Sequence, residues 1–174
     1  MSAIHVAEPH PYVVAVDPGT HRCGVALFRG PLLHSETLTL PLSRRIVPLA
    51  RTCLLVERVI EIADTWRDEI DEAHLVYEMP GHFSSEPRPI IPLHQFVGAL
   101  HYAAWKRKYM VVGYPVSAVK LGVAGRANAS KAEVEAILRH EFNLHDQRLA
   151  SDQWDAIAVG VYHLAQLRIR RAII

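Results

Sequence analysis

The chain has 174 residues, half of them hydrophobic, which fits one domain with an ordinary buried core. No apolar run is long enough to cross a bilayer, and the start of the chain lacks a signal-peptide pattern, so we expect a cytoplasmic protein outside any membrane. The formal net charge of +1 neither favours nor excludes nucleic acid, because basic residues can gather on one face. Cys23 and Cys53 form no CxxC or Cys/His cluster and are predicted to be buried thiols, so no zinc site is expected.

An antiparallel meander of three strands is expected first. Residues 1–11 are polar with two prolines, which predicts a loose N-terminal arm before the single domain that the chain forms. The next strand, at about 12–17, carries four consecutive apolar residues and is expected to be buried on both faces. It ends at Asp17, and a Pro-Gly turn leads back into strands at 22–28 and 32–40.

Helices and strands alternate after the meander. Apolar residues at helical spacing predict helices over 48–68, 92–108, about 131–142 and from Ser151 onward, and short apolar runs predict strands over 74–77 and 110–114. In the first of these helices the inward face is expected to carry Leu49, Cys53, Val56, Ile60 and Ala63. Only a short helical turn is expected around Val119, before a Gly-rich loop. This order predicts an α/β fold whose mixed sheet has three antiparallel and then two parallel strands, with helices on both faces.

Two carboxylates are expected at one edge of this sheet. A right-handed crossover places the strand that ends at Glu78 parallel to the strand that ends at Asp17. The carboxyl ends of parallel strands are where open α/β sheets hold their sites. Taken alone, Asp17 has a simpler interpretation as a turn residue that bonds to nearby amides.

The last helix adds two more acids. Asp152 and Asp155 lie three residues apart and therefore on one helical face. Asp152 also suits the positive end of a helix, whereas Asp155 lies in a helix that is apolar on nearly every side, where an unpartnered carboxylate costs several kcal/mol. No lysine or arginine is expected beside these acids. Their common partner is therefore expected to be a hard divalent cation such as Mg²⁺, and two such ions about 4 Å apart can support phosphodiester hydrolysis.

Four segments, in this order and spacing, carry a resemblance: VVAVDPGTHRCGVAL, VYEMP, PVSAVKLGVAGRANASK and SDQWDAIAVGVYHL. Together they resemble the RuvC-type Holliday junction resolvases of the RNase H-like superfamily. The resemblance implies an RNase H-like fold, a homodimer, and two Mg²⁺ ions, for which Mn²⁺ can substitute, held by catalytic acids at Asp17, Glu78, Asp152 and Asp155. It also implies that Lys120 and Lys131 lie near the scissile phosphate, although by spacing alone both lysines are ordinary solvated residues.

The segment after Glu78 departs from the family pattern. Resolvases of this family commonly have an aromatic residue that helps to open the junction where this chain has Gly81. Phe83 is the expected substitute, and the alternative is that its ring anchors the loop. His82 and Arg126 are further candidates for contact with DNA.

The sequence therefore predicts a Mg²⁺-dependent endodeoxyribonuclease that resolves four-way junctions by paired symmetric nicks, without a nucleotide cofactor. One alternative is the YqgF-like branch of the same fold, which is tied to RNA processing and has a similar DPGTHRCGVAL segment. Another is a phosphate-loop domain of the actin and sugar-kinase type, which needs a second such domain and more chain. A third is a branched-DNA-binding module without catalysis, in which four acids would repel one another with no ion to offset the charge.

Overall fold

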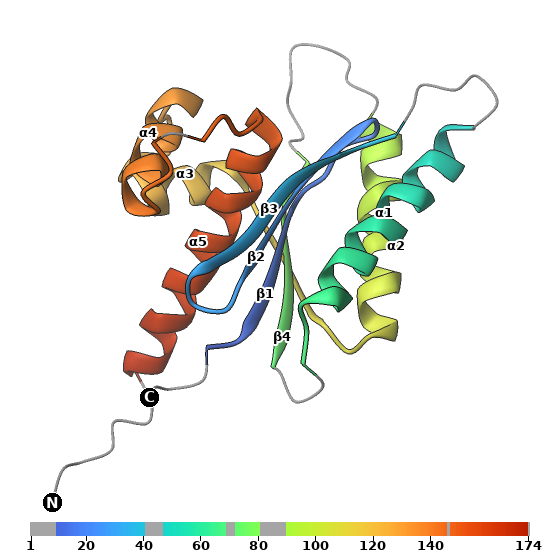
Figure 1. The fold of residues 1–174 in the computed structure, drawn as a ribbon, viewed down its shortest axis with the longest axis horizontal. Coiled ribbons are helices and arrows are strands. Elements are labelled where there is room, and N and C mark those ends of the chain that lie inside the picture. The colour runs from blue at the N-terminus through green and yellow to red at the C-terminus, as the bar shows by residue number, and fades with distance from the viewer. Residues whose placement is uncertain (1–9, 41–46, 69–71, 81–89, 146, 174) are drawn as a thin grey trace, which may run out of the picture.

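A computed structural model describes residues 10–40, 47–68, 72–80, 90–145 and 147–173. The strands are β1 (Tyr12–Asp17), β2 (Arg22–Phe28), β3 (Leu32–Thr39), β4 (Ala73–Glu78) and β5 (Met110–Tyr114). The helices are α1 (Pro48–Thr65), α2 (Ile90–Lys106), α3 (Val116–Ala124), α4 (Lys131–Glu141) and α5 (Ser151–Ile173). The sheet separates two helical layers, with α1 and α2 on one face and α3, α4 and α5 on the other (Figure 1). None of the helices in these ranges has the length and apolar character needed to cross a membrane.

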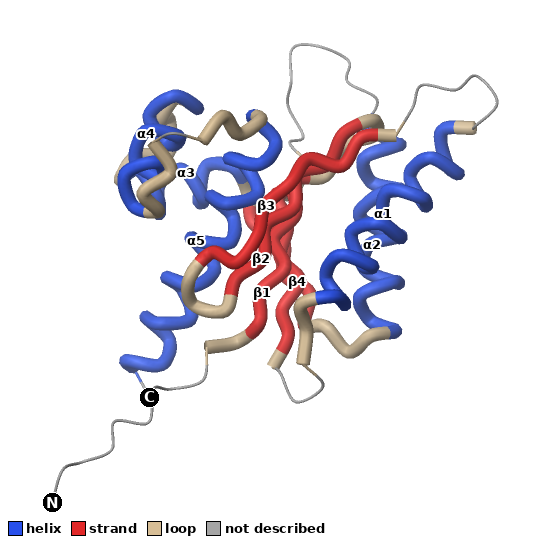
Figure 2. Tube along the Cα trace, viewed as in Figure 1, coloured by secondary structure: helices blue, strands red, loops and turns tan. Residues whose placement is uncertain are grey.

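The strand order is β3-β2-β1-β4-β5. Figure 2 shows the strands between the two helical layers. The first three strands pair antiparallel and the last two join in parallel, as the sequence predicts. In this register Asp17 lies opposite Gly24 on β2, and Val16 lies opposite Tyr77 on β4. The carboxyl ends of β1 and β4 are therefore neighbours, which confirms the predicted edge.

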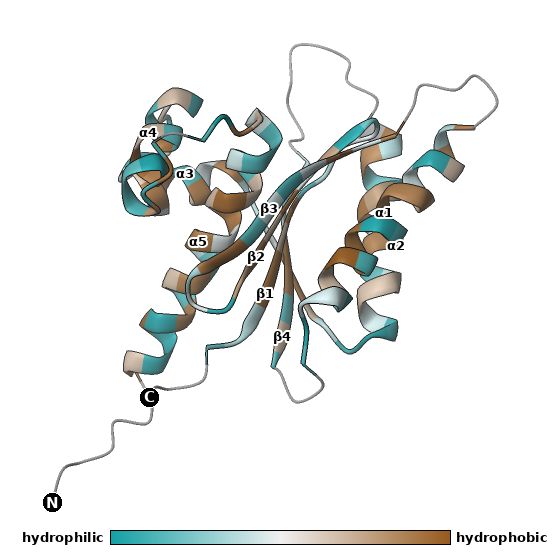
Figure 3. Cartoon of the chain, viewed as in Figure 1, coloured by the Kyte–Doolittle hydropathy of each residue, from teal (hydrophilic) through white to brown (hydrophobic). Residues whose placement is uncertain are grey.

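The core lies on both faces of β1, whose residues Tyr12 to Val16 are all fully buried. Val14 and Val16 belong to the apolar cluster with α1 and α2, while Val13 and Ala15 belong to the cluster with α5. Hydrophobic residues accordingly follow the inner strands in Figure 3. A strand covered on both faces has no solvent-facing side, which explains its uninterrupted apolar sequence.

The buried face of α1 differs from the predicted one. Leu55 and Val59 are fully buried, whereas Leu49 and Cys53 are exposed. The face of α1 that packs on the sheet is thus rotated toward Leu55 and Val59. The predicted inward face is only partly buried. The prediction of two buried thiols is therefore correct for Cys23 and wrong for Cys53.

A complete helix, α3, occupies the segment where only one helical turn was expected. It ends at Gly125, whose left-handed backbone (φ 73°) lets its N–H bond to the Leu121 carbonyl at 2.9 Å. Gly122 inside the helix favours a loop by propensity, but its missing side chain is required by packing, because a Cβ there would lie 2.2 Å from the Tyr162 ring. Close contact with α5 thus outweighs the local preference.

Candidate active site

The site lies at the carboxyl edge of β1 and β4. Asp17 is the last residue of β1 and Glu78 is the last residue of β4. The strand partner of Asp17 is Gly24, where an added Cβ would lie 1.8 Å from the backbone oxygen of Asp152. The glycine therefore lets the first turn of α5 rest directly on the sheet beside Asp17.

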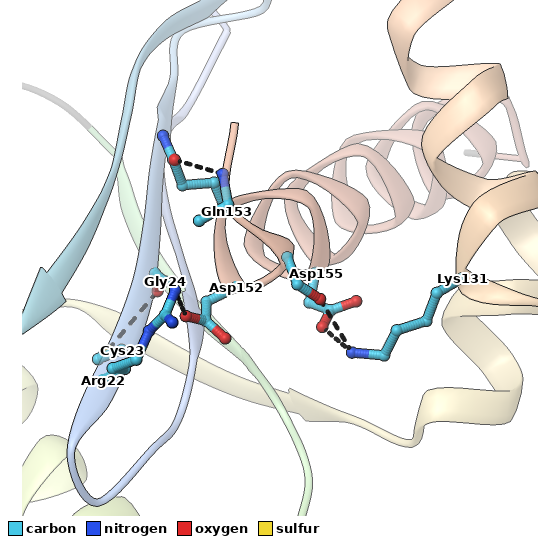
Figure 4. A network of polar contacts seen from close by, with 9 residues as sticks. Arg22, Cys23, Gly24, Lys131, Asp152, Gln153 and Asp155 are labelled. Atoms are coloured by element: carbon cyan, nitrogen blue, oxygen red, sulfur yellow. Dashed lines mark hydrogen bonds and ion pairs between the residues drawn. The ribbon is translucent and has the colours of Figure 1, made fainter. Parts of the chain in front are cut away.

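A glutamine side chain fixes the start of α5. The Ala150 N–H donates to Gln153 Oε1 at 2.9 Å (Figure 4), and Gln153 Nε2 donates to the Ser35 carbonyl at 3.0 Å. The first bond satisfies an N–H just before the helix, and the second ties the helix to β3. Because Gln153 lies between Asp152 and Asp155 in the sequence, these bonds set the position of both acids relative to the sheet.

Each acid of α5 has a basic partner, so the expectation that no lysine or arginine lies beside the carboxylates is wrong. Arg22 Nη2 lies 2.8 Å from Asp152 Oδ2, and Lys131 Nζ forms an ion pair with Asp155 Oδ2 (Figure 4). Lys131 Nζ also lies 3.5 Å from Ser151 Oγ. Spacing along the chain gives no sign of these pairs, because strand register and helix packing bring residues together that are far apart in sequence.

A capping box places Lys131. Ser130 Oγ accepts a bond from the Glu133 N–H, and Glu133 Oε2 accepts one from the Ser130 N–H at 2.8 Å. The predicted helix start is thereby confirmed, and Lys131 is its first residue. Glu133 also forms an ion pair with Arg126, whose side chain is half exposed. Contact of Arg126 with DNA stays a prediction.

The carboxylates are close enough to influence one another strongly. Burial is the largest cause that raises the pKa of Asp17 well above its ordinary value. The charges of Glu78, Asp155 and Asp152 raise it further, and the Lys131 ammonium opposes them. Burial and the neighbouring negative charges destabilise the ionised form of Asp17. A cation beside this carboxylate would relieve the repulsion.

Glu78 belongs to the same electrostatic cluster. Burial, followed by the charge of Asp155, raises its pKa to about 7, while Lys131 and Lys120 lower it. Burial lowers the pKa of Lys131, but its hydrogen bond to Asp155 and the surrounding carboxylates outweigh burial and raise it overall. Both lysines predicted near the scissile phosphate therefore lie within electrostatic reach of Glu78.

The donors present fit a hard divalent cation. All four predicted ligands offer carboxylate oxygens, which Mg²⁺ prefers. Asp152 Oδ2 is a buried atom that has Arg22 beside it but makes no hydrogen bond of proper geometry. Within the described ranges, no three acidic, histidine or cysteine side chains already surround a point where an ion could sit. Two of the carboxylates instead face Lys131 and Arg22.

Two predicted DNA-contacting residues, His82 and Phe83, lie outside the residues that the structure describes. The sequence analysis also missed Arg22, whose side chain is about half exposed at the rim of the site. It could be found only from the strand register, which places Gly24, two residues further along β2, opposite Asp17.

The strand order, with acids at the ends of two neighbouring parallel strands and on the helix packed against them, defines a domain of the RNase H-like nuclease class. The model of the family described as crossover junction endodeoxyribonuclease RuvC matches residues 13–163. The chain belongs to this family.

Individual relatives agree with this assignment. The crossover junction endodeoxyribonuclease RuvC of Nocardia farcinica is 30% identical over 154 residues, which cover 87% of this chain and 79% of the relative. That of Helicobacter pylori strain P12 is 25% identical over 159 residues, which cover 90% and 98%. The structure described as T. thermophilus RuvC in complex with Holliday junction substrate superposes with a TM-score of 0.78 at 26% identity and covers 92% of this chain and 96% of that one.

Proposed function

We propose that this protein is a metal-dependent endodeoxyribonuclease that resolves four-way DNA junctions by paired symmetric nicks. The convergence of Asp17, Glu78, Asp152 and Asp155 at one sheet edge is the observation that carries the proposal. A relative with the same fold has been solved with a Holliday junction substrate, which supports the choice of DNA. A DNA substrate also fits the cytoplasm as the place of action.

The four carboxylates are proposed to hold two Mg²⁺ ions, for which Mn²⁺ can substitute. Once bound, the ions supply the Lewis acidity that phosphodiester hydrolysis requires. The residues of the chain orient the DNA: Lys131 at the start of α4 and Lys120 on α3 provide positive charge for the phosphate that is cut. Arg126 and the undescribed His82 are proposed to contact the flanking backbone.

The two-fold symmetry of a four-way junction calls for two sites in a two-fold dimer. A candidate interface is the outward face of α2, where Ile91, Tyr102 and Trp105 are 72%, 63% and 71% exposed. Gly98 lies on the same face, since positions 91, 98, 102 and 105 follow one another at steps of seven, four and three. Large exposed aromatic residues in one stripe are typical of a protein interface.

Two alternatives stay open. They differ from the proposal in which nucleic acid is cut and in whether the junction is cut at all. A YqgF-like enzyme would cut structured RNA in preference to a four-way DNA junction. A non-catalytic module would bind the junction and leave it intact in any metal. The lysines near Glu78 and the two acids of α5 favour the DNA resolvase over both.

Cleavage of labelled four-way, three-way and linear DNA with Mg²⁺, and with EDTA in its place, tests the proposal. We expect symmetric nicks only in the four-way junction and only with Mg²⁺. Asp17→Asn, Glu78→Gln and Asp155→Asn should each lower the rate by at least about 100-fold, because each removes a proposed ligand, and should leave junction binding intact or tighter.

The matched control is Asp64→Asn. This acid pairs with Arg107 at 2.7 Å on the opposite helical layer and should be dispensable for cleavage. Near-parental cleavage by any of the three site variants would show that the assigned ligands are wrong. Bound but uncut junctions would favour the non-catalytic module.

A further inference from the structure

A buried chain of polar side chains runs between the sheet and α5, apart from the carboxylates. His74 Nδ1 lies 2.7 Å from His163 Nε2, and His163 Nδ1 lies 2.7 Å from the Tyr114 hydroxyl. At the far end, His74 Nε2 lies 3.0 Å from Glu72 Oε1. The two histidines are 1% and 2% exposed. Sequence analysis gave no role to either of them.

When both histidines are neutral, the protons in this chain have one consistent arrangement. With Glu72 ionised it can only accept, so His74 donates from Nε2 and keeps Nδ1 as an acceptor. His163 then donates from Nε2 to His74, and its Nδ1 accepts from the Tyr114 hydroxyl. Burial is the largest cause that lowers the pKa of His163 to about 4, which keeps this ring neutral near pH 7. Every ring nitrogen of the pair therefore has a partner.

The chain joins the elements that carry the carboxylates. His74 lies on β4 four residues before Glu78, so both side chains are on the same face of the sheet. Tyr114 is the strand partner of Glu78, and its carbonyl accepts a bond from the Met79 N–H at 2.8 Å. The Tyr114 hydroxyl thus links the strand partner of Glu78 to His163 on α5.

His163 lies on nearly the same face of α5 as Asp152. It follows Asp152 by eleven residues, which is about three helical turns and returns to nearly the same face. Between them α5 packs on the sheet through small and apolar residues such as Ala156, Ile157 and Gly160. Hydrogen bonds require a defined direction and length, so the bonds of His163 add a directional constraint to this packing.

We propose that His163, bonded to His74 and Tyr114, is a positioning residue that fixes the setting of α5 against β4 and β5, and so the spacing between Glu78 and the acids of α5. The proposal rests on the nuclease function proposed above. His163 touches neither substrate nor ion in this scheme. It acts through the helix that carries Asp152 and Asp155.

Tyr114→Phe is the sharpest test, because it removes one oxygen and keeps the ring. We expect the Mg²⁺ concentration for half-maximal junction cleavage to rise about 3- to 10-fold, as expected for the loss of one buried hydrogen bond that orients the ligands. The Mg²⁺ affinity of the DNA-free protein, measured by calorimetry, should fall by the same factor. His163→Leu should act in the same direction, and the double variant should be no worse than His163→Leu, since both changes break one chain.

Tyr77→Phe is the matched control. Tyr77 directly precedes Glu78, but its hydroxyl bonds to His101 on α2 at 3.1 Å, across the other face of the sheet. Its loss removes a tyrosine–histidine bond of the same kind without touching α5. Mg²⁺ affinity should be unchanged. An equal loss in both variants would overturn the positioning role and leave only general destabilisation.

NMR of the metal-free protein separates this inference from the nuclease proposal. The amide signals of Asp152 and Asp155 should shift in Tyr114→Phe and stay in place in Tyr77→Phe, whether or not the parent cuts DNA. Unmoved amide signals would refute the positioning role, whereas absence of cleavage by the parent would refute only the nuclease.

Discussion

Lys131 and Arg22 each form an ion pair with one carboxylate of α5. Both side chains are more than half exposed, so neither pair contributes much to folding stability. Their positive charge reduces the repulsion among acids that would otherwise face one another unshielded. In the proposed mechanism, a bound ion would take over this charge and leave Lys131 available for phosphate.

Glu78 should give the metal-free protein a characteristic response to pH. Burial and Asp155 raise its pKa from 4.5 to about 7, so folding favours the protonated form. The resulting stability is fully present below about pH 4.5 and is lost as pH rises through 7. We expect Glu78→Gln to melt higher than the parent by an amount that grows over this window and reaches on the order of 5 °C.

Thermal melts in EDTA across this pH range provide the measurement. His163 acts in the opposite direction, because its lowered pKa makes stability rise with pH between about 4 and 6.5. The difference between variant and parent is therefore the informative quantity. A constant difference from pH 4.5 to 8 would show that Glu78 titrates normally.

Phe83 carries a prediction that rests on sequence alone. It is the only large aromatic residue between Glu78 and α2 and is proposed to stack on a base at the junction centre. Such stacking is worth about 1 to 3 kcal/mol, so Phe83→Ala should slow cleavage of intact junctions by about 5- to 150-fold. Junctions with unpaired bases at the branch should be affected much less.

Fluorescence of 2-aminopurine at the branch point reports strand opening directly. If the alanine variant opens and cuts paired junctions as fast as the parent, Phe83 is only a loop anchor.

At the scale of elements, the Ser130 cap at the start of α4 also positions Lys131 beside the site. Ser130→Ala removes the cap and should cost about 1 kcal/mol, which lowers the melting temperature by about 2 to 4 °C. Because Lys131 is the first residue of the helix, cleavage should also decline. Ser117→Ala, at an exposed position inside α3, is the control and should leave the melting temperature nearly unchanged. Equal melting temperatures for both variants would show that the cap is not formed.

The strands and most of the helices could be predicted because their sequence patterns are local. Asp17 and Glu78 each end an apolar run at a Pro-Gly break, and the crossover rule then brings them together. The pair of Lys131 and Asp155 depends instead on how α4 packs against α5, which no local pattern encodes. His74 and His163 were overlooked for the same reason: 89 residues separate them, and only the fold makes them partners.

At the scale of the molecule, a net charge of +1 does not exclude nucleic acid, because several basic residues share a layer with the acids. Lys120, Lys131 and Arg126 lie on the layer that holds α5. We expect junction binding to weaken steeply as salt rises and to be largely independent of sequence, while cleavage depends on sequence. Lys131→Met should reduce the slope of log affinity against log salt by about 1.

Arg58→Met, on α1 across the sheet, is the control and should leave this slope unchanged. Binding isotherms at several salt concentrations supply the slopes. A flat salt response of the parent would exclude nucleic acid as the main partner.

The proposed dimer makes a second prediction at this scale. A Cβ at Gly98 meets no other atom within 4 Å, so Gly98→Arg can fold but would place a long cation in the α2 stripe. We expect the dimer to dissociate at least about 100-fold more readily, as for a buried unpaired charge in an interface. Ala136→Arg on the exposed face of α4 adds the same charge elsewhere and should stay dimeric in sedimentation measurements. A dimeric Gly98→Arg would place the interface on another surface.

The proposed ligands come from positions 17, 78, 152 and 155, so the site draws on nearly the whole length of the folded chain. Because the last helix supplies two of them, β1 and β4 can pair while the protein still has no complete site. Contacts between residues this far apart in sequence form late in folding. During synthesis the strands leave the ribosome before α5 does. On the proposed assignment, a nascent or partly folded chain would lack two of the four ligands, and the ability to cut DNA would arise only once α5 has docked.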